Sequence, residues 1–218
     1  MFNRNYGEGK IQMIDVYDNV LEDHVAEFVD MEIKKLAWYY DYSSVAGKPN
    51  KHWHIMAGDS VKDLEDGPYA FLLFIWRAAF QKYNFREKYK IEGFQRAYMN
   101  AHTHGIEPHL HMDDGSYTMI YYPRLDWQRE WEGGTIIYGK QINEKWDDPE
   151  IEKHVKYKGN RLIVFPAHRP HQAQPVSRQC YGLRTCVVFK TYSEGEIKET
   201  LEFYRENLAK GKYKVKWE

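Results

Sequence analysis

Hydrophobic residues in the first third of the chain recur with the spacing of an α-helix. The clearest repeat runs through 20–33, where apolar side chains return every three or four residues and Asp23 stands at a position suited to a helix cap. A second helix is predicted over 68–83, because the run AFLLFIWRAAF is apolar almost all round, which is typical of a helix buried against a sheet. We therefore expect a helical N-terminal third with short strands.

The pattern changes from Phe94 onward to short β-prone runs separated by turn residues. These runs cover 94–102, 116–123, 133–139, 154–159, 160–168 and 183–190. Several short strands at this spacing favour a β-sandwich or a jelly roll. Helical spacing returns over 194–209, and the final KGKYKVKW is interpreted as an exposed edge or a frayed end. We expect a single domain, with helical support over about 1–90, a β core over about 91–192 and a C-terminal helix.

Composition narrows the class of protein. The 218 residues carry a net charge of −1, which provides no general attraction to nucleic acid or to an anionic membrane. Aromatic residues make up 16% of the chain, which suits a β-rich fold. No apolar run is long enough for a transmembrane helix, and the N-terminus lacks the apolar stretch of a secretory signal. The only cysteines, Cys180 and Cys186, have no spacing that demands a disulfide or a zinc site, so we expect an intracellular, cytoplasmic protein.

Candidate metal ligands stand at His111, Asp113 and His171. If His111 and Asp113 lie on a strand, residues i and i+2 point to the same face and can reach one ion. In a jelly roll, the strand that ends before His171 can pack opposite them and supply the third ligand. Two histidines and one carboxylate form the facial set that holds non-haem Fe(II), which indicates an oxygen-activating enzyme. The chain contains 10 histidines, so spacing alone leaves chance and a distal ligand at His168 as alternatives.

Two segments carry further motifs. In IYYPRLDWQREWEGGTIIYG at 120–139, a tyrosine-bearing strand leads into a D-W segment and a Gly-Gly turn. In NRLIVFPAHRPHQAQPVSRQCYGLRT at 160–185, an apolar strand ends in F-P before a histidine and a basic residue. Together with the HxD motif, these segments resemble the 2-oxoglutarate and Fe(II)-dependent dioxygenases of the prolyl 4-hydroxylase-like family, over about 98–190. The resemblance implies a mainly β fold with flanking helices, in which N-terminal helices brace a double-stranded β-helix (jelly roll) core.

The resemblance also implies roles for the matched residues. His111, Asp113 and His171 match the iron ligands of the family, which selects His171 over His168. Arg184 matches the basic residue that holds the distal carboxylate of 2-oxoglutarate. A planar guanidinium suits that task because it can bind a carboxylate through two parallel hydrogen bonds.

Two tyrosines complete the implied site. Tyr122 matches a residue that hydrogen-bonds the same carboxylate, and Tyr98 matches a pocket tyrosine on the strand before the HxD motif. The spacing departs from the family pattern, because the interval from His171 to Arg184 is longer than usual. Arg178 is therefore a rival for the carboxylate role, although a solvated loop residue is the simpler interpretation of it.

The function that the resemblance implies is hydroxylation of an unactivated C–H bond. Fe(II) is the metal, 2-oxoglutarate the co-substrate and O2 the oxidant, with release of succinate and CO2, and ascorbate is a further cofactor of such enzymes. The implied substrate is a prolyl residue in a protein or peptide. Trp127 and Trp131 would line a peptide groove, unless they are core residues. An oxygenase of a free amino acid or another small molecule is the alternative.

Two interpretations from other classes stay open. A cupin-type metalloenzyme that does not use 2-oxoglutarate could employ the HxH pair His109 and His111 with Asp113 or Asp114. A jelly roll can also serve as a binding module in which the histidines are surface groups.

Overall fold

The computed structural model describes residues 14–45, 47–139 and 150–193. The predicted helix over 194–209 and the KGKYKVKW tail lie outside these residues. The helices are α1 (Asp23–Lys34), α2 (Val61–Asp66), α3 (Leu73–Gln81) and α4 (Phe85–Tyr89), with 3-10 turns η1 (Ala70–Leu72) and η2 (Arg129–Trp131). The strands are β1 (Asp15–Asp18), β2 (Tyr39–Tyr42), β3 (His52–Gly58), β4 (Ile91–His102), β5 (Tyr117–Tyr122), β6 (Thr135–Tyr138), β7 (Ile151–Val155), β8 (Arg161–Pro166), β9 (His171–Ala173) and β10 (Arg184–Ser193). The expectation of a mainly β protein with helices is confirmed.

Two antiparallel sheets make up the β structure. Seven strands follow the order β1-β8-β5-β10-β4-β3-β2, and three follow the order β7-β6-β9. Strand β10 lies between β5 and β4, and its register places Arg184 opposite His102 and Lys190 opposite Thr118. Directly opposite residues of an antiparallel pair point to the same face of the sheet. The register therefore gathers polar side chains from three neighbouring strands on one face.

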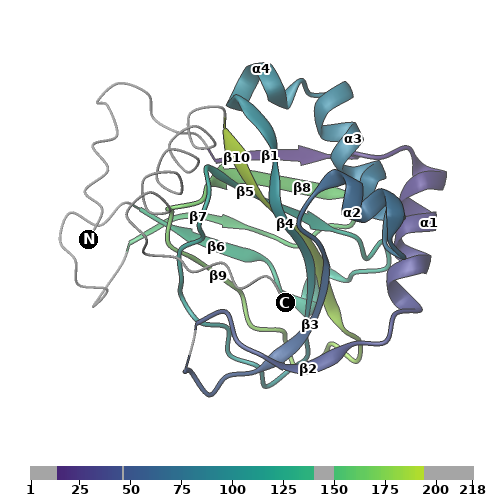
Figure 1. Ribbon diagram of the computed structural model, residues 1–218. Helices are drawn as coiled ribbons and strands as arrows, with labels where there is room; N and C mark the ends of the chain where they lie inside the picture. Colours follow the sequence, from purple (N-terminus) through teal and green to yellow (C-terminus); the bar gives the residue numbers. More distant parts are fainter. Residues whose placement is uncertain (1–13, 46, 140–149, 194–218) are drawn as a thin grey trace, which may run out of the picture.

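The alternation of side chains along β5 separates two hydrophobic clusters. Met119 and Tyr121 belong to a cluster shared with helices, whereas Ile120 and Tyr122 belong to a cluster shared with β6 and β7. Successive residues of a strand point to opposite faces, so one strand serves both clusters. Figure 1 shows the helices gathered on one side of the seven-stranded sheet and β6, β7 and β9 on the other.

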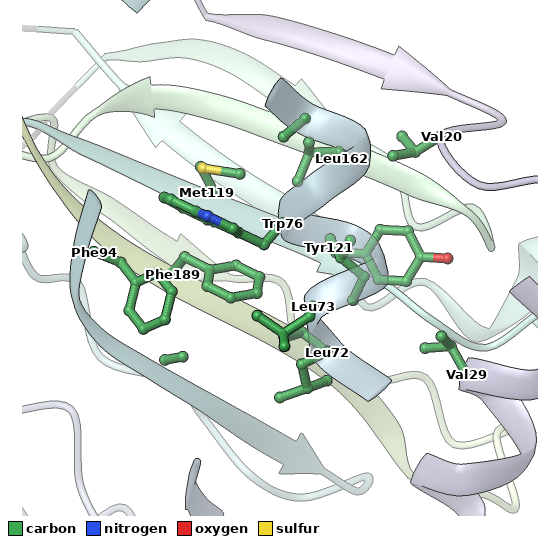
Figure 2. Packing of buried hydrophobic residues seen from close by; sticks show 14 of the residues in the cluster. Val20, Val29, Leu72, Leu73, Trp76, Phe94, Met119, Tyr121, Leu162 and Phe189 are labelled. Carbon is green, nitrogen blue, oxygen red and sulfur yellow. The ribbon is translucent and has the colours of Figure 1, made fainter. Parts of the chain in front are cut away.

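Aromatic packing links α3 to the larger sheet. Trp76 lies beside Met119, Phe94 and Phe189 in Figure 2, with its ring centroid 4.8 Å from that of Phe94 and 5.5 Å from that of Phe189. Val29 of α1 belongs to the same cluster and is fully buried. Buried aromatic pairs of this kind combine a large apolar area with favourable tilted ring contacts.

Both N-terminal helices occur near their predicted positions, with two differences. Helix α1 has Glu22 at its N-cap and no side-chain capping bond, so the expectation that Asp23 caps it is wrong. Asp23 lies instead in the first turn, where its charge complements the helix dipole. The predicted helix over 68–83 occurs as η1 followed by α3, and its Phe74 is 42% exposed, so this helix is not buried all round.

Five predicted strands occur as β4, β5, β6, β8 and β10, but the strand predicted over 154–159 is wrong. The pairing there involves β7, which ends at Val155. The chain then turns at Gly159 and Asn160, and Asn160 adopts a φ of 59°, which a strand does not allow. Within the described residues, no helix has the length and apolar character needed to cross a membrane, and the two cysteines are buried and unpaired.

Candidate metal centre

Backbone pairing brings the two candidate histidine ligands together. The N–H of His111 donates to the carbonyl of His171 at 3.0 Å, and the N–H of His171 donates back at 2.9 Å. His111 takes part in this isolated β-bridge and not in a longer strand. Asp113 lies in a loop, where its N–H donates to the carbonyl of Ala167 at 2.9 Å. The expectation that His111 and Asp113 share one face of a strand is therefore wrong. A bridge and a loop, rather than strand alternation, place them.

The three candidate ligands converge on one point. One ligand atom from each of His111, Asp113 and His171 lies within 4.8 Å of the others, and they form the metal-competent group found among the described residues. His111 Nε2 is 3.8 Å from Asp113 Oδ1, and His171 Nε2 is 3.4 Å from Asp113 Oδ2. His168 and His109 do not belong to this group. The spacing therefore leaves room for one ion between three donors.

Hydrogen bonds to the backbone orient both imidazole rings. Nδ1 of His111 lies 2.8 Å from the carbonyl oxygen of His109, and Nδ1 of His171 lies 2.9 Å from that of Arg169. A carbonyl only accepts, so each Nδ1 carries a proton and each Nε2 turns towards Asp113. This is the arrangement in which histidines bind metals, with the second ring nitrogen held by a carbonyl.

The ligand atoms of His111, Asp113 and His171 together require a cation between them. Neutral histidines would direct two Nε2 lone pairs at the carboxylate of Asp113, which is unfavourable unless a proton or a metal ion lies between them. Burial and the neighbouring His171 lower the pKa of His111 to about 4, so this ring is neutral under ordinary conditions. Burial alone would raise the pKa of Asp113, but His171 and Lys190 outweigh it and hold that pKa below the usual range. The donor set thus fits a divalent ion such as Fe(II).

Two further side chains hold the carboxylate of Asp113. Thr118 donates its hydroxyl to Oδ2 at 2.6 Å, and Lys190 Nζ lies 3.0 Å from Oδ1. Lys190 also pairs with Asp114, whose side chain is 56% exposed and which stands outside the ligand group. Sequence reasoning missed Thr118 and Lys190. Strand periodicity does place Thr118 on the same face as Tyr122, but only the β5–β10 register brings Lys190 opposite it.

The candidate metal ligands line a cavity between the two sheets. Its other walls come from both sheets and two loops, and include Ser44, Tyr98, Asn100, His102, Pro108, Thr118, Thr135, Arg184 and Cys186. Two predicted site residues, Tyr98 and Arg184, are therefore in place around the cavity. Arg178 lies in an exposed turn away from it. Pro108 brings the loop after β4 to the cavity wall.

Tyr122 lies behind the cavity wall rather than in it. Its ring is fully buried, and its hydroxyl lies 2.6 Å from Oγ1 of Thr135, which does line the cavity. The guanidinium carbon of Arg184 lies 5.6 Å from the Tyr122 ring centroid. Burial raises the pKa of Tyr122 to about 12, so the phenol keeps its proton. Any effect of Tyr122 on a ligand would pass through Thr135 or Arg184.

Arg184 is a buried cation without an acidic partner. Its side chain is 1% exposed, and Nε donates to the carbonyl of Gly133 at 2.6 Å while Nη2 donates to that of Gly134 at 3.3 Å. Nη1 lies 3.4 Å from both Cys186 Sγ and His102 Nδ1. None of the ion pairs among the described residues includes Arg184. A buried charge is costly unless it is paired, so the cavity is built to receive an anion.

A group of polar side chains continues from Arg184 along β4 and β3. The rings of His102 and His52 lie 4.8 Å apart, and His54 donates Nδ1–H to Asn100 at 2.8 Å. Burial lowers the pKa of His52 to about 4 and also lowers that of His54, so both rings are neutral. Sequence reasoning left His102 without a role, since its contact with Arg184 depends on strand pairing.

Comparison with known proteins identifies the fold. No protein-family model and no curated protein matches the sequence. A prolyl-4-hydroxylase from Pseudomonas putida matches with a TM-score of 0.61 and 11% identity, covering 84% of this chain and 94% of that one. A 2OG-Fe(II) oxygenase family oxidoreductase from Burkholderia pseudomallei gives 0.57 at 15% identity, covering 83% and 84%.

A third solved structure holds a metal and a co-substrate. HygX from Streptomyces hygroscopicus, with nickel and 2-oxoglutarate bound, matches with a TM-score of 0.57 and 10% identity, covering 84% of each chain. Likeness at such low identity concerns the fold and not the activity. The chain therefore has the jelly-roll fold of these 2OG-Fe(II) oxygenases.

Proposed function

We propose that this protein is an Fe(II)- and 2-oxoglutarate-dependent dioxygenase. The observation that carries the proposal is the combination, in one cavity, of the His111, Asp113 and His171 ligand group with the buried, acid-free cation of Arg184. The first fits a divalent ion with open coordination positions, and the second fits an anion. A 2-oxo acid with a distal carboxylate satisfies both requirements at once.

Each residue has a task in this proposal. His111 and His171 present Nε2 to the metal, and Asp113 supplies a carboxylate oxygen whose orientation Thr118 and Lys190 maintain. Arg184 receives the distal carboxylate of 2-oxoglutarate, and the Tyr122 hydroxyl supports that wall through Thr135. Tyr98 is 6% exposed and closes one side of the cavity against water.

When bound, Fe(II) together with 2-oxoglutarate and O2 would provide the chemistry that oxidises an unactivated C–H bond and releases succinate and CO2. The protein contributes fixed ligand geometry and a shielded cavity. His111 is neutral and Asp113 is ionised, so neither of these two ligands has to lose a proton before the metal binds. Ascorbate is proposed only because of the resemblance to prolyl hydroxylases.

A prolyl residue in a protein or peptide is the substrate that we propose. The likeness to a prolyl-4-hydroxylase supports this choice. Trp131 is 2% exposed and is therefore a core residue, whereas Trp127 borders a separate surface cavity of about 690 Å³. A free amino acid or another small molecule is the alternative. Mass spectrometry of candidate peptides should detect the gain of one oxygen atom on proline, and oxidation of free amino acids alone would refute the peptide substrate.

Separate substitutions of Asp113 and its neighbour Asp114 test the metal centre. Asp113→Ala should abolish formation of the visible charge-transfer band that Fe(II) and 2-oxoglutarate produce without oxygen, and should abolish succinate formation with oxygen. Asp114→Ala, which removes the exposed neighbour, should retain both signals. Full activity in Asp113→Ala would refute the assignment.

The cupin alternative is tested at His109. Its Nε2 is buried without a hydrogen-bond partner, and it stands outside the ligand group. We expect His109→Ala to retain metal binding, whereas a cupin that uses the HxH pair would lose the metal. A binding module without enzymatic activity would produce no succinate in the wild type.

A further inference from the structure

In the contact between Arg184 and His102, Arg184 must be the hydrogen-bond donor and His102 the acceptor. The two residues are opposite each other in the β10–β4 register, and Nη1 of Arg184 lies 3.4 Å from Nδ1 of His102. A guanidinium has donors and no acceptor, so Nδ1 must present its lone pair. A neutral ring in this tautomer carries its proton on Nε2.

His102 is held in the neutral form. The residue is 4% exposed, and burial together with the positive charge of Arg184 holds its pKa well below the ordinary value. The ring also contacts His52 edge-on, with 4.8 Å between the ring centroids. His102 therefore neither compensates the charge of Arg184 nor repels an anion placed beside it.

The Nε2–H of His102 is available to a ligand. His102 lines the same cavity as Arg184 and the candidate metal ligands. Its contact with Arg184 uses Nδ1, so the Nε2–H takes no part in that contact. A neutral imidazole N–H is a good donor to a carboxylate oxygen, and the bond is stronger because the acceptor is charged.

The donors of Arg184 are largely committed within the protein. Carbonyl oxygens of Gly133 and Gly134 take donors from Nε and Nη2, and His102 and Cys186 share contacts with Nη1. A guanidinium has five N–H groups, so few remain for an incoming carboxylate. A carboxylate has about four acceptor sites, and it therefore needs a donor besides Arg184.

We propose that His102 is a second protein ligand for the distal carboxylate of 2-oxoglutarate, to which it donates its Nε2–H while Arg184 supplies the positive charge. The inference rests on the proposed function, because it takes 2-oxoglutarate as the ligand of this cavity. It assigns a binding role to a residue outside the matched motifs.

Two conservative substitutions separate the two ring nitrogens. His102→Asn places an amide near the position of Nδ1, so it can still accept from Arg184 but has no group at the Nε2 position. His102→Gln reaches the Nε2 position and can still donate there. His104→Gln, in the exposed turn that follows β4, is the matched control.

Ligands with and without the distal carboxylate supply the decisive readout. The dissociation constants of 2-oxoglutarate and of pyruvate, which has the same chelating 2-oxo acid group, are measured with Fe(II) under anaerobic conditions. We expect His102→Asn to weaken 2-oxoglutarate binding about tenfold or more, as for loss of a hydrogen bond to a charged group. Binding of pyruvate should not change, and His102→Gln should restore most of the affinity for 2-oxoglutarate.

The outcomes are distinct. Normal 2-oxoglutarate binding by His102→Asn, or equal weakening of 2-oxoglutarate and pyruvate, would overturn the role of His102 and leave the proposed function intact. Failure of the wild-type protein with Fe(II) to bind 2-oxoglutarate would overturn both. Selective weakening of 2-oxoglutarate in His102→Asn, with recovery in His102→Gln, supports the inference.

Discussion

His111 and His171 exchange both of their backbone hydrogen bonds, although a long stretch of chain separates them. This pairing holds their ring centroids 4.4 Å apart and leaves Asp113 as the only acidic member of the ligand group among the described residues. The centre is therefore built on main-chain geometry, and its side chains depend on neighbours from other strands for their orientation.

Thr118 should support metal binding through its bond to Asp113. Thr118→Val removes a hydroxyl donor 2.6 Å from Oδ2 and keeps the shape of the side chain. Loss of such an outer partner typically weakens metal affinity about 10- to 100-fold. Calorimetric titration with Mn(II) measures the change without any need for turnover.

Thr185 supplies the control for that experiment. It is 3% exposed and its Oγ1 has no hydrogen-bond partner, so Thr185→Val removes an unsatisfied buried hydroxyl. We expect unchanged Mn(II) affinity and equal or higher stability. Equal metal affinity in Thr118→Val and Thr185→Val would contradict the role of Thr118.

Gly133 should be required for the position of Arg184. Its φ is 73°, and an added Cβ would lie 3.0 Å from Trp127 and 3.1 Å from Cγ of Arg184. Gly105 has a φ of 88° with open space around it. Alanine at either position should cost about 1 kcal/mol or more for the left-handed backbone. Only Gly133→Ala should also weaken 2-oxoglutarate binding, which anaerobic titration measures, and equal binding by the two variants would disprove the dependence.

Asn160 should stabilise the junction between β8 and the start of α1. Its side chain accepts from the N–H of Leu21 at 2.9 Å and from the Tyr121 hydroxyl at 3.2 Å, and donates to the carbonyl of Leu21 at 2.9 Å. Asn160→Ala should lower the free energy of unfolding by about 2–4 kcal/mol, because it leaves buried partners unsatisfied. Glycine tolerates the φ of 59°, so Asn160→Gly should be less destabilised than Asn160→Ala by up to about 1 kcal/mol. Urea denaturation measures both, and wild-type stability of Asn160→Ala would contradict the prediction.

Asp18 should make a pH-dependent contribution to stability. Its pKa is lowered to about 2, chiefly by the hydrogen bond from Arg161 and further by Lys158. Because the pKa of Asp18 is lower in the folded than in the unfolded state, its carboxylate stabilises the folded state at pH values above 3.8. This stabilisation is lost as the pH falls through about 2. Asp18→Asn should therefore be less stable at neutral pH, by no more than about 1 kcal/mol because the carboxylate is 37% exposed, and the difference should vanish as the pH falls below about 2.

The exposed pair of Arg77 and Glu65 provides the comparison for Asp18. Its side chains are 54% and 48% exposed, and water screens such a pair strongly. Glu65→Gln should change the unfolding free energy little at any pH. A stability difference between Asp18→Asn and the wild type that stays constant from neutral pH to about pH 2 would contradict the linkage argument.

Local patterns in the sequence predicted much of the fold. The periodicity of 20–33 indicated α1, and the β-prone runs indicated β4, β5, β6, β8 and β10, because burial on one face imposes a repeat that depends only on the element itself. The bounds of β7 were missed, because this strand begins at Ile151, before the predicted run, and its pairing with β6 ends at Val155.

The amino-acid sequence alone shows which residue types are available for chemistry, namely the HxD motif, a later histidine and an arginine on a β-prone run. The resemblance already favoured His171 over His168, but the contacts of Thr118 and Lys190 with the carboxylate of Asp113, and that of His102 with Arg184, appear only in the folded chain. The physical reason is that side-chain identity is local, whereas a ligand group needs atoms within a few ångströms of one another. Pairing between strands that lie far apart in the chain supplies that proximity.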